Sequence, residues 1–263
     1  MITFFDLTVH LYGLFVGLGA VIAYMIIEKI GKKDGFDESQ ILKMAASMFL
    51  GALIGARAWH VWTDWHLYAD QPLAAVAIWN GGLSILGAFA GGALFLFFMN
   101  RWQVTAHKHS DEKVISLAHF ADLIAFGAPI GQMVGRLGNA FNQELYGSPT
   151  NFPWKIYIAP ENRFENYLDA AFYHPLFAYE ILLLGLFVLG YFYLERSGIW
   201  ERGKGNFVIA YAFYYAIVRF ALDFLRVDKV FFAESALGLN QVVLLIFICV
   251  LSVVILYRKK RSV

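Results

Sequence analysis

The sequence is poor in charged residues and in cysteine. Only 16% of its 263 residues are Asp, Glu, Lys or Arg, whereas a soluble domain of this length has about 25%. The net charge is +1, and the one cysteine is Cys249. A chain this close to neutral lacks the basic field that attracts nucleic acid, and a single cysteine excludes an intrachain disulfide framework and a cysteine zinc site. We therefore expect no nucleic acid among its partners.

Apolar residues dominate the chain instead. Hydrophobic types make up 59% of it, which excludes a disordered chain and most soluble enzymes and indicates a polytopic membrane protein. A bilayer core of about 30 Å needs about 20 apolar residues per helix. We expect an all-α integral membrane protein with a single membrane-embedded domain over residues 1–263 and an outer loop or arm at about 148–173. Seven apolar runs predict the transmembrane helices, at about 8–27, 42–62, 82–99, 114–135, 175–194, 206–225 and 239–257.

The basic residues of the connections predict the orientation. Lys and Arg gather after the first, third and fifth predicted helices and in the tail, and the alternate connections are poor in them. Because cytoplasmic connections carry this excess, the N-terminus is predicted outside and the C-terminus in the cytoplasm. Several glycines in the third and fourth helices indicate close helix packing or local unwinding.

Ionisable side chains within the predicted spans fall mostly in the outer half. Such groups are costly in a bilayer and usually mark function. They come from at least five helices, so we infer one polar cavity that opens to the outer leaflet or to the outer aqueous side. The set consists of Arg57, Asp122, Arg136, His174, Glu180, Arg219 and Asp223, with Tyr12 at a similar depth.

The sixth predicted helix carries a polar stripe. Tyr215, Arg219, Asp223 and Arg226 are spaced i, i+4, i+8 and i+11, so they share one helical face. Asp223 is expected to hold Arg219 or Arg226 in place and to limit the desolvation cost. One interpretation is a structural ion pair between helices. The other is an anion site, because two further arginines lie at a similar depth and arginine binds phosphate in a bidentate manner. In an outer-leaflet cavity that anion is a phospholipid headgroup.

A second polar segment spans residues 135–147. If it is helical, Arg136, Asn139 and Gln143 share a face, and the amides supply neutral donors and acceptors. Glu144 is expected to orient an arginine or to act as a base. The general alternative is a polar helix end.

Segment 135–147 also resembles the signature of a known family, the prolipoprotein diacylglyceryl transferases. That signature reads Gly-Arg-x-Gly-Asn, then Asn, Glu and a closing Gly. The resemblance extends in collinear order over about 12–228. The supporting matches are Tyr12-Gly13, Gly55-Ala56-Arg57, Trp79-x-Gly81-Gly82-x-Ser84, Asp122, Pro129-x-Gly131, His174-Pro175 with Tyr179-Glu180, and the stripe of Tyr215, Arg219, Asp223 and Arg226.

The resemblance implies a reaction and its partners. A diacylglyceryl group moves from phosphatidylglycerol to the lipobox cysteine thiol of a prolipoprotein that carries a signal peptide, a thioether forms, and glycerol phosphate leaves. The implied location is the bacterial cytoplasmic (inner) membrane, which the protein crosses several times, with the active site towards the outer leaflet of the bilayer. No metal and no soluble cofactor is implied.

Such a site must hold a phosphate, orient a glyceryl carbon and help to form a thiolate. The resemblance implies that Arg136 and Arg219 grip the phosphate, that Arg57 or Arg226 assists, and that acids orient the arginines. The expected catalytic residues are Arg136, Arg219, Glu144, Tyr215 and His174, and the expected substrate-binding residues are Tyr12, Arg57, Gly81, Gly82, Asn139, Asn142, Gly147, Asp223 and Arg226.

The sequence departs from the family where a proton acceptor is expected. Many members carry His or Tyr shortly after the Trp-x-Gly-Gly turn, whereas this chain has Leu86, and Leu176-Phe177 stand where members usually have Ser-Gln. His174, His60 and Glu144 are candidates to replace the missing group, although a His beside Pro often serves only as a hydrogen bonder at a helix start. Two alternative functions remain open. One is a divergent family member that transfers the lipid group to another acceptor substrate, and the other is a non-catalytic protein that binds or moves an anionic lipid.

Overall fold

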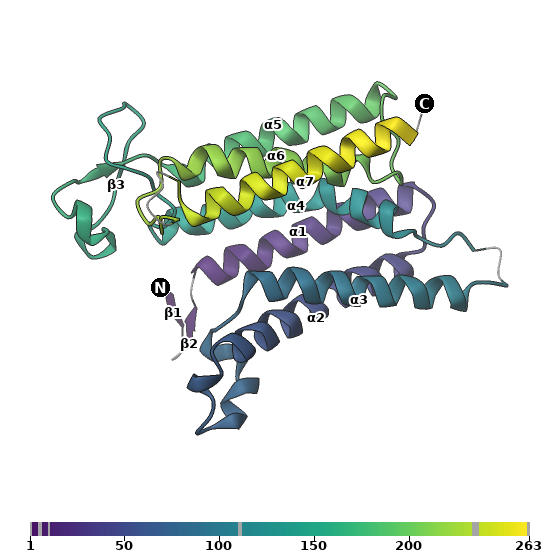
Figure 1. Cartoon of the computed structure of the whole chain (residues 1–263), viewed down its shortest axis with the longest axis horizontal. Coiled ribbons are helices and arrows are strands. Elements are labelled where there is room, and N and C mark those ends of the chain that lie inside the picture. Colours follow the sequence, from purple (N-terminus) through teal and green to yellow (C-terminus); the bar gives the residue numbers. More distant parts are fainter. Residues whose placement is uncertain (1, 5–6, 10, 110–111, 233–236, 262–263) are drawn as a thin grey trace. The chain divides into compact units, whose positions relative to one another are not determined.

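A computed structural model describes residues 2–4, 7–9, 11–109, 112–232 and 237–261. Long α-helices dominate this part of the chain (Figure 1). Each of the seven predicted runs corresponds to one of them. The helices are α1 (Leu11–Lys33), α2 (Glu38–Thr63), α3 (Ile85–Ala106), α4 (Leu117–Phe141), α5 (Leu176–Arg196), α6 (Asn206–Asp223) and α7 (Leu239–Arg261).

Within the described residues, six helices are long and apolar enough to cross a membrane, namely α1, α2, α3, α4, α5 and α7. The expectation of a mostly helical, multi-pass membrane protein is confirmed. Helix α6 is not among the six; it has 18 residues and carries Arg219 and Asp223. A seventh span and the orientation of the termini therefore stay predictions.

The first helix begins later than predicted. Thr8 lies in β2 (Leu7–Val9), which pairs antiparallel with β1 (Ile2–Phe4), and α1 starts only at Leu11. An apolar run of this kind also suits a strand, and hydrophobicity alone does not separate the two. The remaining elements are short: η1 (Trp65–Leu67), η2 (Pro72–Val76), η3 (Ile78–Asn80), β3 (Ile156–Tyr157), η4 (Pro160–Asn162), η5 (Glu165–Tyr167) and β4 (Phe172–Tyr173).

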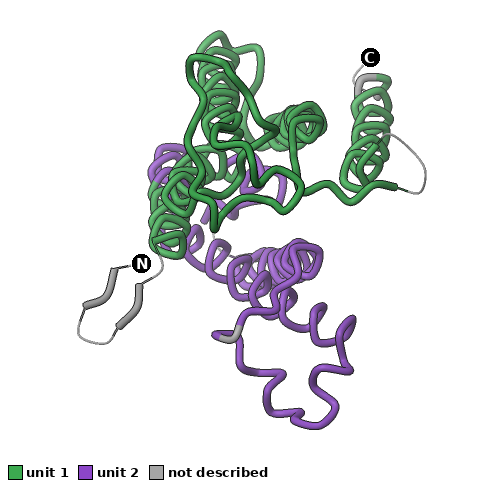
Figure 2. Tube along the Cα trace, turned by 90° about the vertical axis from the view of Figure 1, so that its left-hand side faces the viewer, with its two compact units in different colours: residues 1–25, 124–263 green, residues 26–123 purple. Residues whose placement is uncertain are grey.

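The chain divides into two compact units, which Figure 2 colours separately. Unit 1 comprises Met1–Met25 and Ile124–Val263, and unit 2 comprises Ile26–Leu123. Unit 1 therefore contains most of α1 and α4 together with α5, α6, α7 and the arm. Unit 2 contains α2, α3 and the loop between them.

Glycines allow close helix crossings within each unit. In unit 2, a Cβ added to Gly51 of α2 would lie 2.5 Å from the carbonyl oxygen of Gly91 in α3, and in unit 1 a Cβ on Gly131 of α4 would lie 2.6 Å from the carbonyl oxygen of Gly19 in α1. Both distances are far below van der Waals contact, so only glycine fits. The close packing predicted from the glycines is confirmed for α3 and α4.

This packing predicts opposite effects for two identical changes in α4. Gly131→Ala should lower the melting temperature in detergent, because its Cβ forces α4 away from α1 and overpacking costs about 1–3 kcal/mol. Gly135→Ala meets nothing within 4 Å and should leave the melting temperature unchanged or raise it, since alanine is the better helix former. Equal melting temperatures for the two variants would contradict the crossing.

Residues 148–173, which we call the arm, form a folded loop. Its strands β3 and β4 pair antiparallel, and Ile158 and Tyr173 pack with Tyr146 as a small buried cluster. The Tyr146 hydroxyl donates to the Asn162 carbonyl at 2.6 Å, and burial raises the pKa of both tyrosines. The arm therefore has a core of its own beside the end of α4.

Candidate active site

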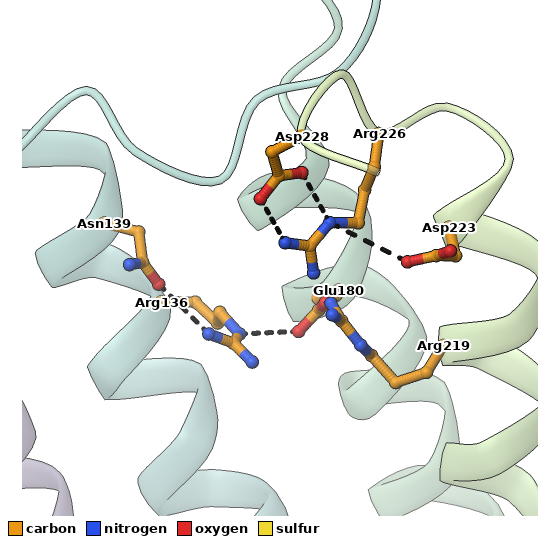
Figure 3. A network of polar contacts seen from close by, with 7 residues as sticks. All are labelled: Arg136, Asn139, Glu180, Arg219, Asp223, Arg226 and Asp228. Atoms are coloured by element: carbon orange, nitrogen blue, oxygen red, sulfur yellow. Dashed lines mark hydrogen bonds and ion pairs between the residues drawn. The ribbon is translucent and has the colours of Figure 1, made fainter. Parts of the chain in front are cut away.

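A buried carboxylate joins two arginines from two other helices (Figure 3). Glu180 of α5 is only 1% exposed. Arg136 of α4 donates from Nε to Glu180 Oε2 at 2.5 Å, and Arg219 of α6 donates from Nη1 to Glu180 Oε1. One acid thus holds two guanidinium groups, which leaves this trio with a net charge of +1. Arg136 has Tyr215 of α6 as a further hydrogen-bond partner.

The amides of the signature connect this trio to Glu144. Arg136 Nη1 donates to Asn139 Oδ1 at 3.1 Å. Asn139 Nδ2 in turn donates to Glu144 Oε2, and Asn142 Nδ2 donates to Glu144 Oε1, both at 3.3 Å. Glu144 therefore contacts Arg136 only through Asn139. The sequence predicted that Glu144 orients an arginine or acts as a base, and its role as a base stays a prediction.

The signature is not one continuous helix. Helix α4 ends at Phe141, and Gln143 and Leu145 both have a φ of 53°, a conformation that non-glycine residues rarely adopt. Gln143 consequently leaves the face of Arg136 that a helix would have given it, and its Oε1 accepts a hydrogen bond from the backbone N–H of Ala159 at 2.7 Å. The amide anchors the arm, so the prediction of a shared face is wrong for this residue.

The polar stripe of α6 also ends early. Helix α6 stops at Asp223, so Arg226 lies beyond it and is held by Asp228, with 2.8 Å from Arg226 Nε to Asp228 Oδ1. Asp223 is 3.7 Å from the same nitrogen and 3% exposed. Asp223 thus orients Arg226, one of the two predicted partners, and Glu180 takes Arg219.

The Arg226–Asp228 pair predicts acid sensitivity. Hydrogen bonds from Arg226 hold the pKa of Asp228 below its ordinary value. A carboxyl with a depressed pKa contributes stability above its unfolded pKa of about 4 and loses it as the pH falls through the folded value. Asp228→Asn should therefore lower the melting temperature at pH 7. The further decrease of the melting temperature below about pH 4 should be smaller in this variant than in the unchanged protein. Asp169→Asn, at an exposed aspartate, serves as the control. An equal change in melting temperature in both variants would contradict a stabilising pair of Arg226 and Asp228.

Two cavities border the polar network around the trio. One of about 360 Å³ is lined by Asn139, Asn142, Glu144, Arg226 and Asp228, among others. The other, of about 290 Å³, is lined by Arg136 and Gln132 with residues of α1 that include Tyr12. Since Arg136 and Asn139 are hydrogen-bonded to each other, the polar network connects the two cavities. The expected neighbourhood of Tyr12 and Arg136 is present.

Arg57 belongs to unit 2 and has a different set of partners from those expected. Its guanidinium donates to the carbonyls of Ala74 and Ala75, both at 2.7 Å, of Gly81 at 2.6 Å and of Gly82 at 3.1 Å. Four bonds occupy most of its five N–H donors. Arg57 therefore holds the loop between α2 and α3, and Gly81 and Gly82 are its acceptors. Contact of these three residues with substrate stays a prediction.

His174 and Gly147 connect the arm to the start of α5. His174 Nδ1 is 2.9 Å from the Tyr179 hydroxyl, which also accepts from Trp154 Nε1 at 2.6 Å. The backbone N–H of Gly147 donates to the His174 carbonyl at 2.8 Å. These contacts give both residues a structural part, and their contact with substrate remains a prediction.

Sequence reasoning missed two acids of the site. The sequence pattern marks Glu180 as a costly polar group without giving it a role, and it gives no role to Asp228. An available signal was the position of Asp228 two residues after Arg226. For Glu180 the available signal was its position as an acid near the outer end of a predicted span, at a depth similar to that of Arg136 and Arg219.

Comparison with known proteins identifies the family of this chain. The sequence model of the prolipoprotein diacylglyceryl transferase family matches residues 1–257. The chain belongs to this family. Three relatives named phosphatidylglycerol–prolipoprotein diacylglyceryl transferase illustrate the similarity. They come from Synechococcus elongatus (31% identical, 97% of this chain and 86% of the relative), Parasynechococcus marenigrum (35%, 86% and 78%) and Fervidobacterium nodosum (30%, 90% and 77%).

Membership of the prolipoprotein diacylglyceryl transferase family confirms the resemblance predicted from segment 135–147. The match extends over both units and ends four residues before the last described residue, Arg261. The family signature supplies Arg136, Asn139 and Glu144 of the network, and the later motifs supply Glu180 and Arg219.

Proposed function

We propose that the protein transfers the diacylglyceryl group of phosphatidylglycerol to the lipobox cysteine of a signal-peptide-bearing prolipoprotein. The observation that carries this proposal is the pair of arginines held by Glu180 in the membrane-spanning bundle. We place the site towards the outer leaflet of a bacterial cytoplasmic membrane, because the basic connections and tail lie at the other ends of the helices.

The reaction is a displacement at carbon. The thiolate sulfur attacks the glyceryl carbon that carries the phosphate ester, and a C–S bond forms. The C–O bond breaks, and its electron pair leaves with glycerol phosphate. Negative charge therefore grows on the phosphate in the transition state, where fixed donors stabilise it best.

Arg136 and Arg219 are suited to that task. Glu180 neutralises only one of the two charges, and each guanidinium has five N–H donors, of which few are used within the trio. We assign the phosphate to these two groups and the glycerol hydroxyls to Asn139 and Asn142, which line the adjoining cavity.

The thiol needs a proton acceptor, and we assign Glu144 to this role. Its carboxylate lines the cavity of about 360 Å³ and is held by two amide donors. The other candidates are engaged elsewhere: His60 Nδ1 is 3.0 Å from Asp64 Oδ2, and His174 contacts Tyr179.

Direct assay tests the proposed function. Purified protein is incubated with phosphatidylglycerol and a lipobox peptide, and the mass of the peptide is measured by mass spectrometry. We expect the cysteine to gain one diacylglyceryl group, with no gain in a Cys→Ser peptide. Bound phosphatidylglycerol without any gain would contradict the transferase and favour a protein that only binds or moves an anionic lipid.

Leu86 provides a test of the proton acceptor. It stands where the family resemblance implies His or Tyr. Leu86 is 59% exposed in α3, so a histidine there causes no overpacking. Leu86→His should leave transfer unchanged or raise it by up to about tenfold, because it restores the base that the family resemblance implies at this position. Severe loss of transfer would show that Leu86 shapes the site. Leu83→His, also about half exposed, is the matched control.

A further inference from the structure

A cavity lies at the end of unit 1 opposite the arm. It has a volume of about 430 Å³, larger than either cavity beside the arginine trio. The start of α6 and the end of α7 line it, and this end of α7 leads to the C-terminus marked in Figure 1. Its lining residues are Trp200, Lys204, Asn206, Ile209, Ala210, Ile255 and Arg258.

The lining of this cavity is divided into a basic end and an apolar wall. Lys204 and Arg258 supply two cations, and none of the described lining residues is an acid. Ile209 and Ile255 lie one turn further into α6 and α7. A cationic mouth above an apolar wall matches a phosphate headgroup followed by an acyl chain.

The two cations are differently restrained. Arg258 donates to the carbonyl of Lys204 and, at 3.4 Å, to that of Gly205, which fixes the guanidinium at the cavity mouth. Lys204 Nζ is 2.8 Å from Glu201 Oε2, and the two side chains are 63% and 72% exposed. Exposed pairs of this kind contribute little, so Lys204 is available to an incoming anion.

A second, apolar cavity adjoins the first. It has a volume of about 190 Å³ between α5 and α6, and its lining includes Leu186, Gly190 and Leu194. Trp200 and Ala210 line both cavities. One basic mouth therefore has two apolar spaces beneath it, one on each side of α6.

We propose that this paired cavity binds one anionic two-chain phospholipid, with its phosphate at Lys204 and Arg258 and its acyl chains on the two sides of α6. Asn206 adds a neutral donor for the headgroup. The site is separate from the arginine trio, because Asn206 and Arg219 are about 20 Å apart along α6. With the orientation proposed above, the lipid belongs to the cytoplasmic leaflet, where anionic lipids attract basic groups.

Photo-crosslinking in bilayers tests this site. The full-length protein is reconstituted with phosphatidylglycerol that carries a diazirine in one acyl chain, and crosslinked peptides are mapped. We expect crosslinks within residues 197–215 and 250–261, and Lys204→Glu should reduce them about tenfold. Lys29→Glu makes the same charge change on an exposed residue of α1 and should not reduce them. Transfer activity should be equal in both variants.

Competition and a packing variant complete the test. Dioleoyl phosphatidylglycerol should displace the probe, and dioleoyl phosphatidylcholine and inorganic phosphate at the same concentration should not. Ala210 lines both apolar spaces, so the larger ring of Ala210→Phe should crowd the acyl chains and reduce the crosslinks. Equal loss in Lys29→Glu and Lys204→Glu, or displacement by inorganic phosphate, would overturn the proposal. Because the crosslinks do not depend on turnover, they remain even if the proposed transfer reaction fails.

Discussion

Arg219→Lys is expected to reduce diacylglyceryl transfer by about 100-fold or more, although the charge is kept. Lysine carries a compact ammonium group, whereas arginine presents a planar fork that binds both a carboxylate and a phosphate. Arg219 donates to Glu180 through Nη1, and its remaining donors are proposed to bind the phosphate of the leaving group. Loss of one fixed donor to a developing oxyanion costs about 10²–10³ in rate.

The measurement is the initial rate of peptide modification at saturating phosphatidylglycerol. Because lysine still neutralises Glu180, the variant should fold, and an unchanged melting temperature verifies this. Arg196→Lys is the matched control, since Arg196 is an exposed arginine at the far end of α5. Full activity in Arg219→Lys would refute the phosphate grip.

Glu180→Gln should impair both folding stability and transfer. Glutamine leaves two mostly buried guanidinium groups side by side without their carboxylate, with side chains only 22% and 18% exposed. Breaking a buried ion pair in this way costs about 3–5 kcal/mol. Repulsion would also displace the arginines, and misplacement of about 1 Å costs about 100-fold in rate.

The kinetic constants separate positioning from general structural damage. We expect kcat to fall about 100-fold while KM for phosphatidylglycerol does not rise, because the unneutralised arginines still attract the phosphate. A raised KM with an unchanged kcat would contradict the positioning role. Glu195→Gln is the control, since Glu195 also lies in α5 and also pairs with an arginine, Arg202. Its loss should leave both constants unchanged.

Different sequence signals predict different features of this fold. The length of the apolar runs located all seven helices, of which six are apolar enough to cross a membrane among the described residues. Helical spacing of polar residues, by contrast, extended two of these helices too far. Segment 135–147 and the stripe ending at Arg226 both read as continuous helix, but α4 stops at Phe141 and α6 at Asp223. Helix ends depend on tertiary hydrogen bonds, such as that from Ala159 to Gln143, which periodicity does not contain.

The same distinction holds for the site. Composition by itself determined that this is a membrane protein, because 16% charge and 59% hydrophobic residues suit a bilayer. The motifs determined the family and selected Arg136 and Arg219, because arginine is too costly in a span without a task. Only the tertiary structure decided which partner each arginine takes. Glu180 binds Arg136 and Arg219 from a third helix, and Arg57 binds carbonyls of the loop that follows its helix. Hydrogen bonds form between groups that folding brings within about 3 Å, whatever their separation along the chain.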